Sequence, residues 1–267
     1  MTTTGAHTTL YRDASLYDIL HTPGTAWEVT GLERTFELHV PEAQRAGPWL
    51  EPACGTGRYL RLLGGRGRAC IGFDAMPSMT AYARTRLERL GLDESVRIID
   101  ADMTGFIDSM PADAPGRVPF AFNLINTFRH LHRDADAHRH LGAMSRVLKP
   151  GGVYAVGIST TAFGIEQPSE DTWSATRGTT RVTQTVQYLP AEARDRVETV
   201  ISHLVAERPG GAQDFDDTYT LRAYTAEQWA DLVAASPLEL QAIVDEQGNE
   251  TDAPMVGYAV YLLRNPG

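Results

Sequence analysis

The run Trp-Leu-Glu-Pro-Ala-Cys-Gly-Thr-Gly-Arg occupies residues 49–58 and decides the fold of this chain. It is typical of a short buried strand that ends abruptly in a glycine turn and leads into a helix. In α/β proteins, such a turn brings the backbone close to a nucleotide-like ligand. Glu51 lies four positions before Gly55, at the end of the strand, where its carboxylate can hold a cationic amine. The stretch therefore predicts a parallel α/β sheet with a ligand site at its first turn.

The composition is that of an ordinary globular protein. The chain has 267 residues, of which 42% are hydrophobic and 22% are charged. This length exceeds a single minimal domain, so we expect one α/β core with an insertion or a small second lobe. The net charge of −10 argues against binding to a nucleic-acid backbone, which depends on clustered Lys and Arg. A small-molecule substrate is favoured.

Two cysteines, Cys54 and Cys70, are the only ones in the sequence. Neither lies in the spacing of a metal site or of a disulfide framework, so we expect no bound metal. The first ten residues are rich in Thr and lack the basic and apolar stretches of a secretory signal. No apolar segment approaches the ~20 residues that a membrane span needs. These features predict a cytoplasmic protein.

Strands and helices alternate along the first 160 residues. Helical spacing of apolar residues and a capping-box pattern, Thr25 to Glu28, predict a helix from residue 25 to 40. A further helix begins near Pro77, and another spans residues 135–148. This alternation predicts a Rossmann-like, doubly wound, mostly parallel sheet covered on both faces. The expected strands are 48–53, 69–74, 96–100, 120–126 and 153–158.

The pattern changes near residue 160. Alternation of side chains predicts a β-rich insertion of three antiparallel strands that covers the active face. A helix opened by Thr225 and two last strands then complete the core sheet, including a terminal antiparallel strand. The expected strands here are 181–188, 196–206, 218–224, 238–244 and 255–264. The expected units are an N-terminal helical lid (1–46), the core (47–160), the insertion (161–224) and the C-terminal part of the core (225–267).

Acidic residues follow three consecutive strands of the predicted sheet. Glu51, Asp74 and Asp102 all fall at carboxyl ends, which line one crevice in a doubly wound sheet. Asp74 lies 17 residues after Gly57, where a carboxylate accepts hydrogen bonds from both hydroxyls of a ribose. Asp74 or Asp102 taken singly is as well explained as a helix cap or a solvated loop carboxylate. The three in order, with the glycine turn, predict a ligand that carries both a ribose and a cationic group.

This arrangement resembles the first motifs of the class I S-adenosylmethionine-dependent methyltransferases. The resemblance implies that S-adenosylmethionine is the cofactor, that Asp102 binds the exocyclic amine of adenine and that Met103 covers the ring. The chain departs from the family at Ala53, where a glycine usually stands. The cofactor residues that the resemblance implies are Tyr17, Glu51, Ala53, Gly55, Gly57, Arg58, Asp74, Ala75, Met76, Asp102, Met103 and Asn126.

A nicotinamide or flavin oxidoreductase is the main competitor within this fold. Its fingerprint requires a third glycine, but Leu60 occupies that place. Glu51 would also repel a pyrophosphate, whereas it would attract the ammonium group of a methionine. Both features favour methyl transfer. A protein that binds the cofactor without catalysis is a third alternative.

The segment Asn-Thr-Phe-Arg-His-Leu, residues 126–131, follows the fourth expected strand. It resembles the corresponding segment of small-molecule N-methyltransferases, including the glycine and amino-sugar groups, which places Asn126 near the sulfonium. The resemblance favours an amine nitrogen over an oxygen as acceptor. A histidine here would accept the proton of the acceptor, since its pKa lies near working pH. The catalytic candidates are His130 and Asn126, with His132 second to His130 as the base, although a histidine here is also typical of a helix cap or of a position that faces water.

Other residues are candidates for contacts to the substrate. Tyr11 and Tyr17 belong to the predicted lid, where a tyrosine binds the methionine carboxylate, seals the site or simply packs on a helix. Arg222 is suited to an acidic acceptor, or to an ion pair within 214–217. The antiparallel insertion also offers a surface for pairing with a second copy. The substrate candidates are Tyr11, Arg129, Trp173, Arg222 and Tyr224.

Overall fold

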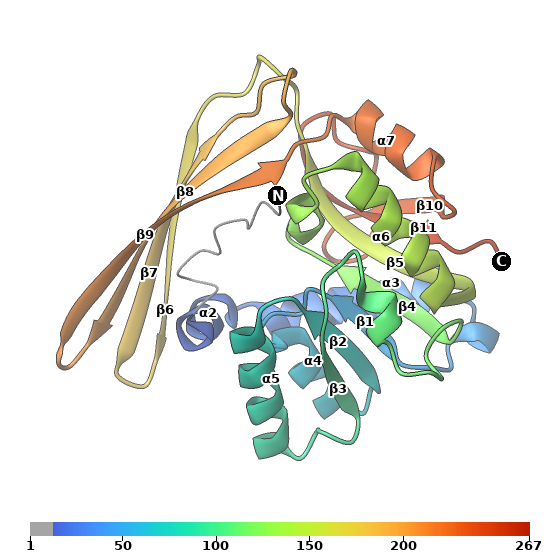
Figure 1. The fold of residues 1–267 in the computed structure, drawn as a ribbon, viewed down its shortest axis with the longest axis horizontal. Helices are drawn as coiled ribbons and strands as arrows, with labels where there is room; N and C mark the ends of the chain where they lie inside the picture. Colours follow the sequence, from blue (N-terminus) through green and yellow to red (C-terminus); the bar gives the residue numbers. More distant parts are fainter. Residues whose placement is uncertain (1–12) are drawn as a thin grey trace.

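Two separate β-sheets form the frame of the protein (Figure 1). The structure is a computed structural model and describes residues 13–267. The larger sheet has seven strands in the order β10-β11-β5-β4-β1-β2-β3, and the neighbours from β3 to β5 are parallel while β11 runs antiparallel to both β5 and β10. Its strands are β1 (Trp49–Pro52), β2 (Cys70–Asp74), β3 (Val96–Asp100), β4 (Val118–Asn123), β5 (Leu148–Thr160), β10 (Glu239–Val244) and β11 (Gly257–Arg264).

The expected doubly wound sheet with a terminal antiparallel strand is confirmed. Helices cover both of its faces because the strands of a buried parallel sheet carry apolar side chains on both sides. The α-helices are α2 (Ala14–His21), α3 (Thr25–His39), α4 (Arg58–Gly65), α5 (Pro77–Leu90), α6 (Asp134–Val147) and α7 (Ala226–Ala234). Short 3-10 helices are η1 (Glu42–Gln44), η2 (Phe106–Ser109) and η3 (Thr127–His130).

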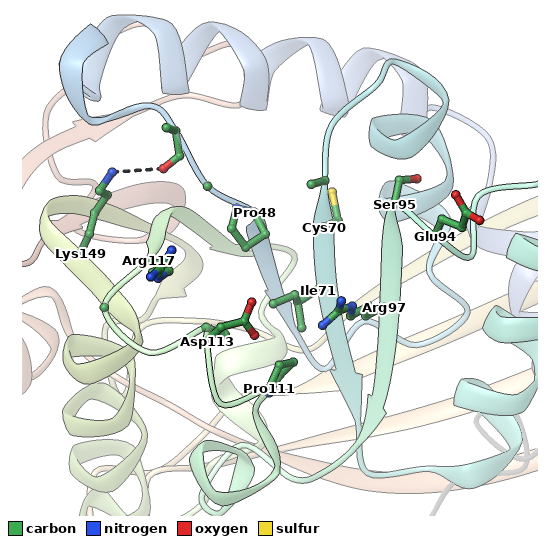
Figure 2. A pocket seen from close by; sticks show the side chains of 15 residues that line it. Pro48, Cys70, Ile71, Glu94, Ser95, Arg97, Pro111, Asp113, Arg117 and Lys149 are labelled. Atoms are coloured by element: carbon green, nitrogen blue, oxygen red, sulfur yellow. Dashed lines mark hydrogen bonds between the residues drawn. The ribbon is translucent and has the colours of Figure 1, made fainter.

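A cavity of about 530 Å³ opens at the amino ends of β1, β2 and β3. Figure 2 shows Pro48, Cys70 and Ile71 along it, with the side chains of Arg97 and Arg117 also lining it. It lies at the opposite edge of the sheet from the carboxyl ends that carry the predicted ligand site. The cavity is therefore separate from that site.

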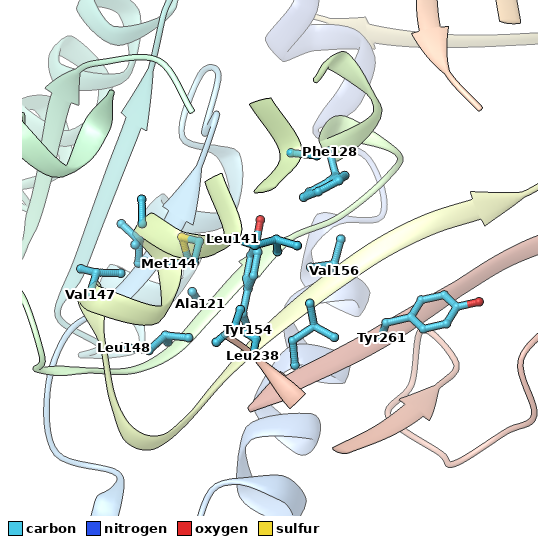
Figure 3. Close-up of a cluster of buried hydrophobic side chains, with 14 of the residues drawn as sticks. Ala121, Phe128, Leu141, Met144, Val147, Leu148, Tyr154, Val156, Leu238 and Tyr261 are labelled. Atoms are coloured by element: carbon cyan, nitrogen blue, oxygen red, sulfur yellow. The ribbon is translucent and has the colours of Figure 1, made fainter. Parts of the chain in front are cut away.

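Alternation along the strands divides the core into two layers. In β4, Ala121 joins a cluster with helices α6 and α7, whereas Phe120 and Phe122 join a cluster with helices α3 and α4 on the other face. Figure 3 shows the first cluster, in which Leu141 and Met144 of α6 pack beside the sheet. The two layers fix the strands and thus the positions of their carboxyl ends.

The smaller sheet is antiparallel and stands to one side of the larger sheet (Figure 1). Helix α2 packs on its inner face, where Leu16, Ile19 and Leu20 contact residues of the sheet such as Val182 and Leu204. We call this unit the antiparallel sheet. Its strands, in spatial order, are β6 (Ser169–Arg177), β7 (Thr180–Leu189), β8 (Val197–Arg208) and β9 (Gly211–Arg222).

The structure corrects two local predictions. Strand β6 was not expected, so the antiparallel sheet has four strands and not three. The capping box predicted at Thr25 is also wrong: Gly24, with φ 85°, is the N-cap of α3, and the Thr25 hydroxyl donates to the carbonyl of Thr22 at 2.7 Å. Thr225 does open α7, in a capping box with Gln228. Among residues 13–267, no helix is long and apolar enough to cross a membrane.

Candidate active site

The turn between β1 and α4 has an unusual backbone. Ala53, Gly55 and Gly57 all have positive φ, at 51°, 53° and 68°. Gly55 and Gly57 adopt this conformation without steric cost, which lets the backbone approach a ligand. Ala53 takes the same left-handed form at a cost of roughly 1–2 kcal/mol for a residue with a Cβ. The position thus has the geometry of a glycine although its residue is an alanine.

Glu51 is the last residue but one of β1, just before this turn. The residue is buried, and no group in the described part of the chain donates a hydrogen bond to its Oε2. Burial raises the pKa of this carboxyl well above its ordinary value, against the opposing charge of Arg58. A buried carboxylate oxygen without a donor is costly unless a ligand supplies one. The site therefore fits a cationic amine, as the ammonium of S-adenosylmethionine would provide.

Asp74 joins the turn to the next helix. Its Oδ2 accepts from the Gly55 N–H at 2.8 Å and its Oδ1 accepts from the Met76 N–H at 2.8 Å. Ala75 between them is exposed. A carboxylate accepts several hydrogen bonds at once, so Asp74 is suited to the hydroxyls of a ribose. The structure thus brings Glu51, the glycine turn and Asp74 together, as the order of the strands predicts.

Asp102 lies two residues beyond the end of β3. Its Oδ1 accepts from the N–H groups of Thr104 and Gly105 at 2.7 and 2.9 Å and from the Thr104 hydroxyl. The Thr104 hydrogen bonds lower the pKa of Asp102, against partial burial. One oxygen thus stabilises the turn into η2, which leaves Oδ2 for an adenine amine. Met103 is half-buried against the core, and its carbonyl oxygen lies 2.8 Å from His140 Nδ1.

Tyr17 of α2 and Arg58, the first residue of α4, flank the turn. The Tyr17 ring lies over the turn, since a Cβ built on Gly55 would be 3.6 Å from it. Burial raises the pKa of Tyr17 to about 12, so its hydroxyl stays protonated. The Arg58 guanidinium instead binds Thr25 and Glu28 of α3, with 2.7 Å from Nη1 to the Thr25 hydroxyl. Arg58 therefore acts on the site through its charge, while Tyr17 covers it.

Asn126 connects the carboxyl ends of β4 and β5. Its Nδ2 donates to the Ser159 hydroxyl at 3.0 Å, and its Oδ1 accepts from the Ser159 N–H at 2.7 Å. Its φ is 61°, which turns the chain sharply into η3. The side-chain amide is thus engaged within the protein, and Asn126 positions the segment that carries Arg129 and His130.

Arg129 and His130 face the antiparallel sheet. Arg129 is buried, donating from Nε to the Arg222 carbonyl at 2.8 Å and from Nη2 to Glu198 at 2.7 Å. The His130 ring stacks on Tyr219 at a centroid distance of 6.0 Å. Burial lowers the pKa of His130 to about 4, with help from the charges of His132 and Arg129. His130 is therefore uncharged at working pH. The sequence alone predicts instead a pKa near working pH, as is usual for a histidine.

Aromatic side chains gather on the inner face of the antiparallel sheet. Tyr188, Val200 and Tyr219 are direct neighbours across three strands and therefore share a face. Trp173 of β6 packs against the same buried cluster as Tyr188 and Tyr219, and its ring is 6.3 Å from that of His21 on α2. The sequence pattern identified Trp173 alone. The tyrosines were missed because alternation gives the faces of a strand but not which face meets the core.

Two predicted substrate residues have other partners. The Arg222 guanidinium binds Asp134 of α6 at 3.2 Å and the Asp195 carbonyl at 2.9 Å. The Tyr224 ring is fully buried against Trp229, with centroids 5.8 Å apart. Both residues thus join the antiparallel sheet to α6 and α7. His132 is exposed, and Tyr11 lies outside the described residues.

Comparison with known proteins agrees with this geometry. Residues 50–152 match a protein family described as "Methyltransferase domain". This segment contains the glycine turn, Asp74, Asp102 and η3. By sequence, no curated protein matches the chain.

Solved structures share the fold over nearly the whole chain. An S-adenosylmethionine-dependent methyltransferase from Clostridium acetobutylicum superposes with a TM-score of 0.71 at 18% identity, covering 95% of this chain and 98% of that one. The amino pentose methyltransferase CalS10 from Micromonospora echinaspora has a TM-score of 0.63 at 21% identity, covering 88% and 91%. The sugar N-methyltransferase KedS8 from a Streptoalloteichus species has a TM-score of 0.62 at 19% identity, covering 90% and 87%. These likenesses establish that the antiparallel sheet belongs to the shared architecture.

Proposed function

We propose that this chain, whose residues 50–152 match a methyltransferase domain, is an S-adenosylmethionine-dependent methyltransferase that methylates an amine nitrogen of a small molecule. The observation that carries this proposal is the inner face of the antiparallel sheet, where Trp173 and Tyr188 lie and where Tyr219 stacks on neutral His130. Aromatic faces attract a cationic group, so they favour an acceptor that arrives as a protonated amine. Names of fold relatives, such as the sugar N-methyltransferase KedS8, are consistent with this acceptor.

The donor residues act by position and charge. When bound, the cofactor supplies a methyl group on a positively charged sulfur, and a lone pair that attacks the methyl carbon displaces the sulfur directly. Glu51 would hold the ammonium, Asp74 the ribose hydroxyls and Asp102 the adenine amine. Tyr17 would cover the turn and exclude water. Holding two reactants in line can supply ~7–11 kcal/mol without a covalent intermediate.

The acceptor needs a free lone pair. An amine of pKa ~10 is mostly protonated at neutral pH, and its deprotonation at pH 7.5 costs about 3.4 kcal/mol. His130, with its pKa lowered to about 4, is too weak a base to keep that proton. Its neutral ring would instead accept a hydrogen bond from the remaining N–H and orient the lone pair. The proton then leaves to solvent before transfer.

A panel of acceptors tests the proposal. S-adenosylhomocysteine production is measured with amino sugars and other small amines, and in parallel with phenols and carboxylic acids. The Asp74→Ala variant, which loses the ribose contacts, serves as the blank. Turnover confined to amines is expected. Turnover with the phenols or carboxylic acids alone would show an O-methyltransferase and contradict the proposal.

A further inference from the structure

Asp18 on helix α2 is a buried carboxylate with partners from three other elements. Its Oδ1 accepts from Arg61 of α4 at 2.7 Å, and its Oδ2 accepts from Arg177 of β6 at 2.7 Å and from the Tyr82 hydroxyl of α5 at 3.0 Å. The residue is completely buried. Burial disfavours its charge, but the charge and hydrogen bonds of the arginines outweigh this and lower its pKa. Asp18 is therefore ionised and is the point at which α2 is joined to its surroundings.

These contacts lead directly to the donor turn. Arg61, besides its bond to Asp18, donates from Nη1 to the carbonyl of Thr56 in the turn at 2.7 Å. The residue before Asp18 is Tyr17, whose ring lies over Gly55. Any movement of α2 away from the core would break the Asp18 contacts and withdraw Tyr17 together.

Arg177 ties the same helix to the antiparallel sheet. Its Nη2 donates to the Asp18 carbonyl at 3.0 Å and to the hydroxyl of Thr22, the C-cap of α2, at 3.1 Å. A cation at a helix C-terminus also interacts favourably with the helix dipole. Arg177 thus binds both the side chain of Asp18 and the end of the helix that carries it.

We propose that Asp18 and Arg177 are positioning residues that fasten α2, and with it Tyr17, over the glycine turn that binds the methyl donor. Arg177 belongs to the strand that carries Trp173, so the wall facing the acceptor also holds the donor in place. The inference concerns donor binding, and it does not depend on which atom accepts the methyl group.

The Arg177→Gln variant tests the proposal. Calorimetric titration of the intact protein with S-adenosylhomocysteine should give a dissociation constant roughly 5- to 20-fold above wild type, as expected for lost charge-assisted hydrogen bonds. Arg177→Lys keeps the charge but not the paired donors of the guanidinium, so its dissociation constant should lie between those of wild type and Arg177→Gln. The matched control is Arg181→Gln, an exposed arginine two residues into the neighbouring strand whose contact to Glu207 is 3.9 Å long; its affinity should equal wild type.

Two further measurements separate fastening from a general loss of structure. Limited proteolysis of the ligand-free protein should cut near α2 faster in Arg177→Gln, and S-adenosylhomocysteine should protect it. In a double-mutant cycle, Arg177→Gln should weaken binding less in the Asp18→Asn background than in wild type, because only its bonds to the Asp18 carbonyl and the Thr22 hydroxyl are then lost. A folded Arg177→Gln protein with wild-type affinity would overturn the proposal. If that variant does not fold, Thr22→Val removes one acceptor of Arg177, and unchanged affinity there would overturn it equally.

Discussion

Replacing Glu51 by Gln removes a buried charge and keeps the shape of the side chain. In the ligand-free protein this charge is destabilising, because Glu51 Oε2 has no hydrogen-bond donor among the described residues. With the donor bound, the same oxygen would face an ammonium. The substitution is therefore expected to stabilise the free protein and to weaken donor binding, two effects of opposite sign.

The magnitude follows from the contact that is lost. A hydrogen bond between charged groups contributes about 1.5–3 kcal/mol, and each 1.4 kcal/mol is tenfold in affinity, so the dissociation constant should rise roughly 10- to 150-fold. Replacing the buried carboxylate by a neutral amide removes the desolvation penalty of the charge, which should raise the free energy of unfolding of the ligand-free protein by on the order of 1 kcal/mol. Arg58 and Arg61 offset part of the charge, which favours the lower ends of both ranges.

Titration calorimetry with S-adenosylhomocysteine and urea denaturation of the free protein measure both effects. Glu88→Gln, at an exposed position of α5, is the matched control and should change neither. The raised pKa of Glu51 adds a pH test: wild-type affinity should fall as pH drops through that pKa, whereas Glu51→Gln should bind equally over the same range. The free wild-type protein should gain stability over that same fall in pH. Equal affinity of variant and wild type at pH 7.5 would refute the electrostatic account.

Two other predictions concern the acceptor side and the core. Burial lowers the pKa of His130 to about 4, so kcat/KM for an amine should rise with pH without an inflection near 6.5. The variant His130→Phe keeps a ring against Tyr219, and it should lower kcat by roughly tenfold while the affinity for S-adenosylhomocysteine stays unchanged. An inflection near 6.5 would mean that His130 does act as the base. Gly72→Ala should lower the free energy of unfolding, measured by urea denaturation, by about 1–3 kcal/mol, because its Cβ would lie 2.3 Å from Leu60 Cδ1. Gly65→Ala, at an open position of α4, should leave the free energy of unfolding unchanged. Equal stabilities of the two variants would contradict the packing argument.

The donor half of the molecule was largely predictable from the sequence because its signals are local. The glycine turn, Asp74 and Asp102 occur at fixed distances along the chain, and parallel strands must bring their carboxyl ends to one edge. The position of Glu51 follows from the same rule. What the pattern could not give is the bond between the turns: Asp74 accepts from the N–H of Gly55, 19 residues away, whereas Asp102 accepts from the N–H of Gly105 in its own turn.

The acceptor half was less predictable because its contacts join residues far apart in sequence. Arg129 bonds to Glu198, 69 residues away, and Arg177 to Asp18, 159 residues away. Strand β6 escaped notice because most of its side chains are exposed and polar, so hydrophobic alternation is weak. The pKa of His130 depends on its burial against Tyr219, which no local pattern reveals.

The two sheets share no ladder of backbone hydrogen bonds; each pairs only within itself. A substitution on the inner face of β7 or β9 can therefore reshape the acceptor wall without shifting the register of β1 or β2. Such independence lets an enzyme lineage acquire new acceptors while its donor chemistry stays constant. In this chain that freedom has limits where side chains join the antiparallel sheet to the core: Arg177 binds Asp18 of α2, Arg129 binds Glu198 of β8 and Arg222 binds Asp134 of α6.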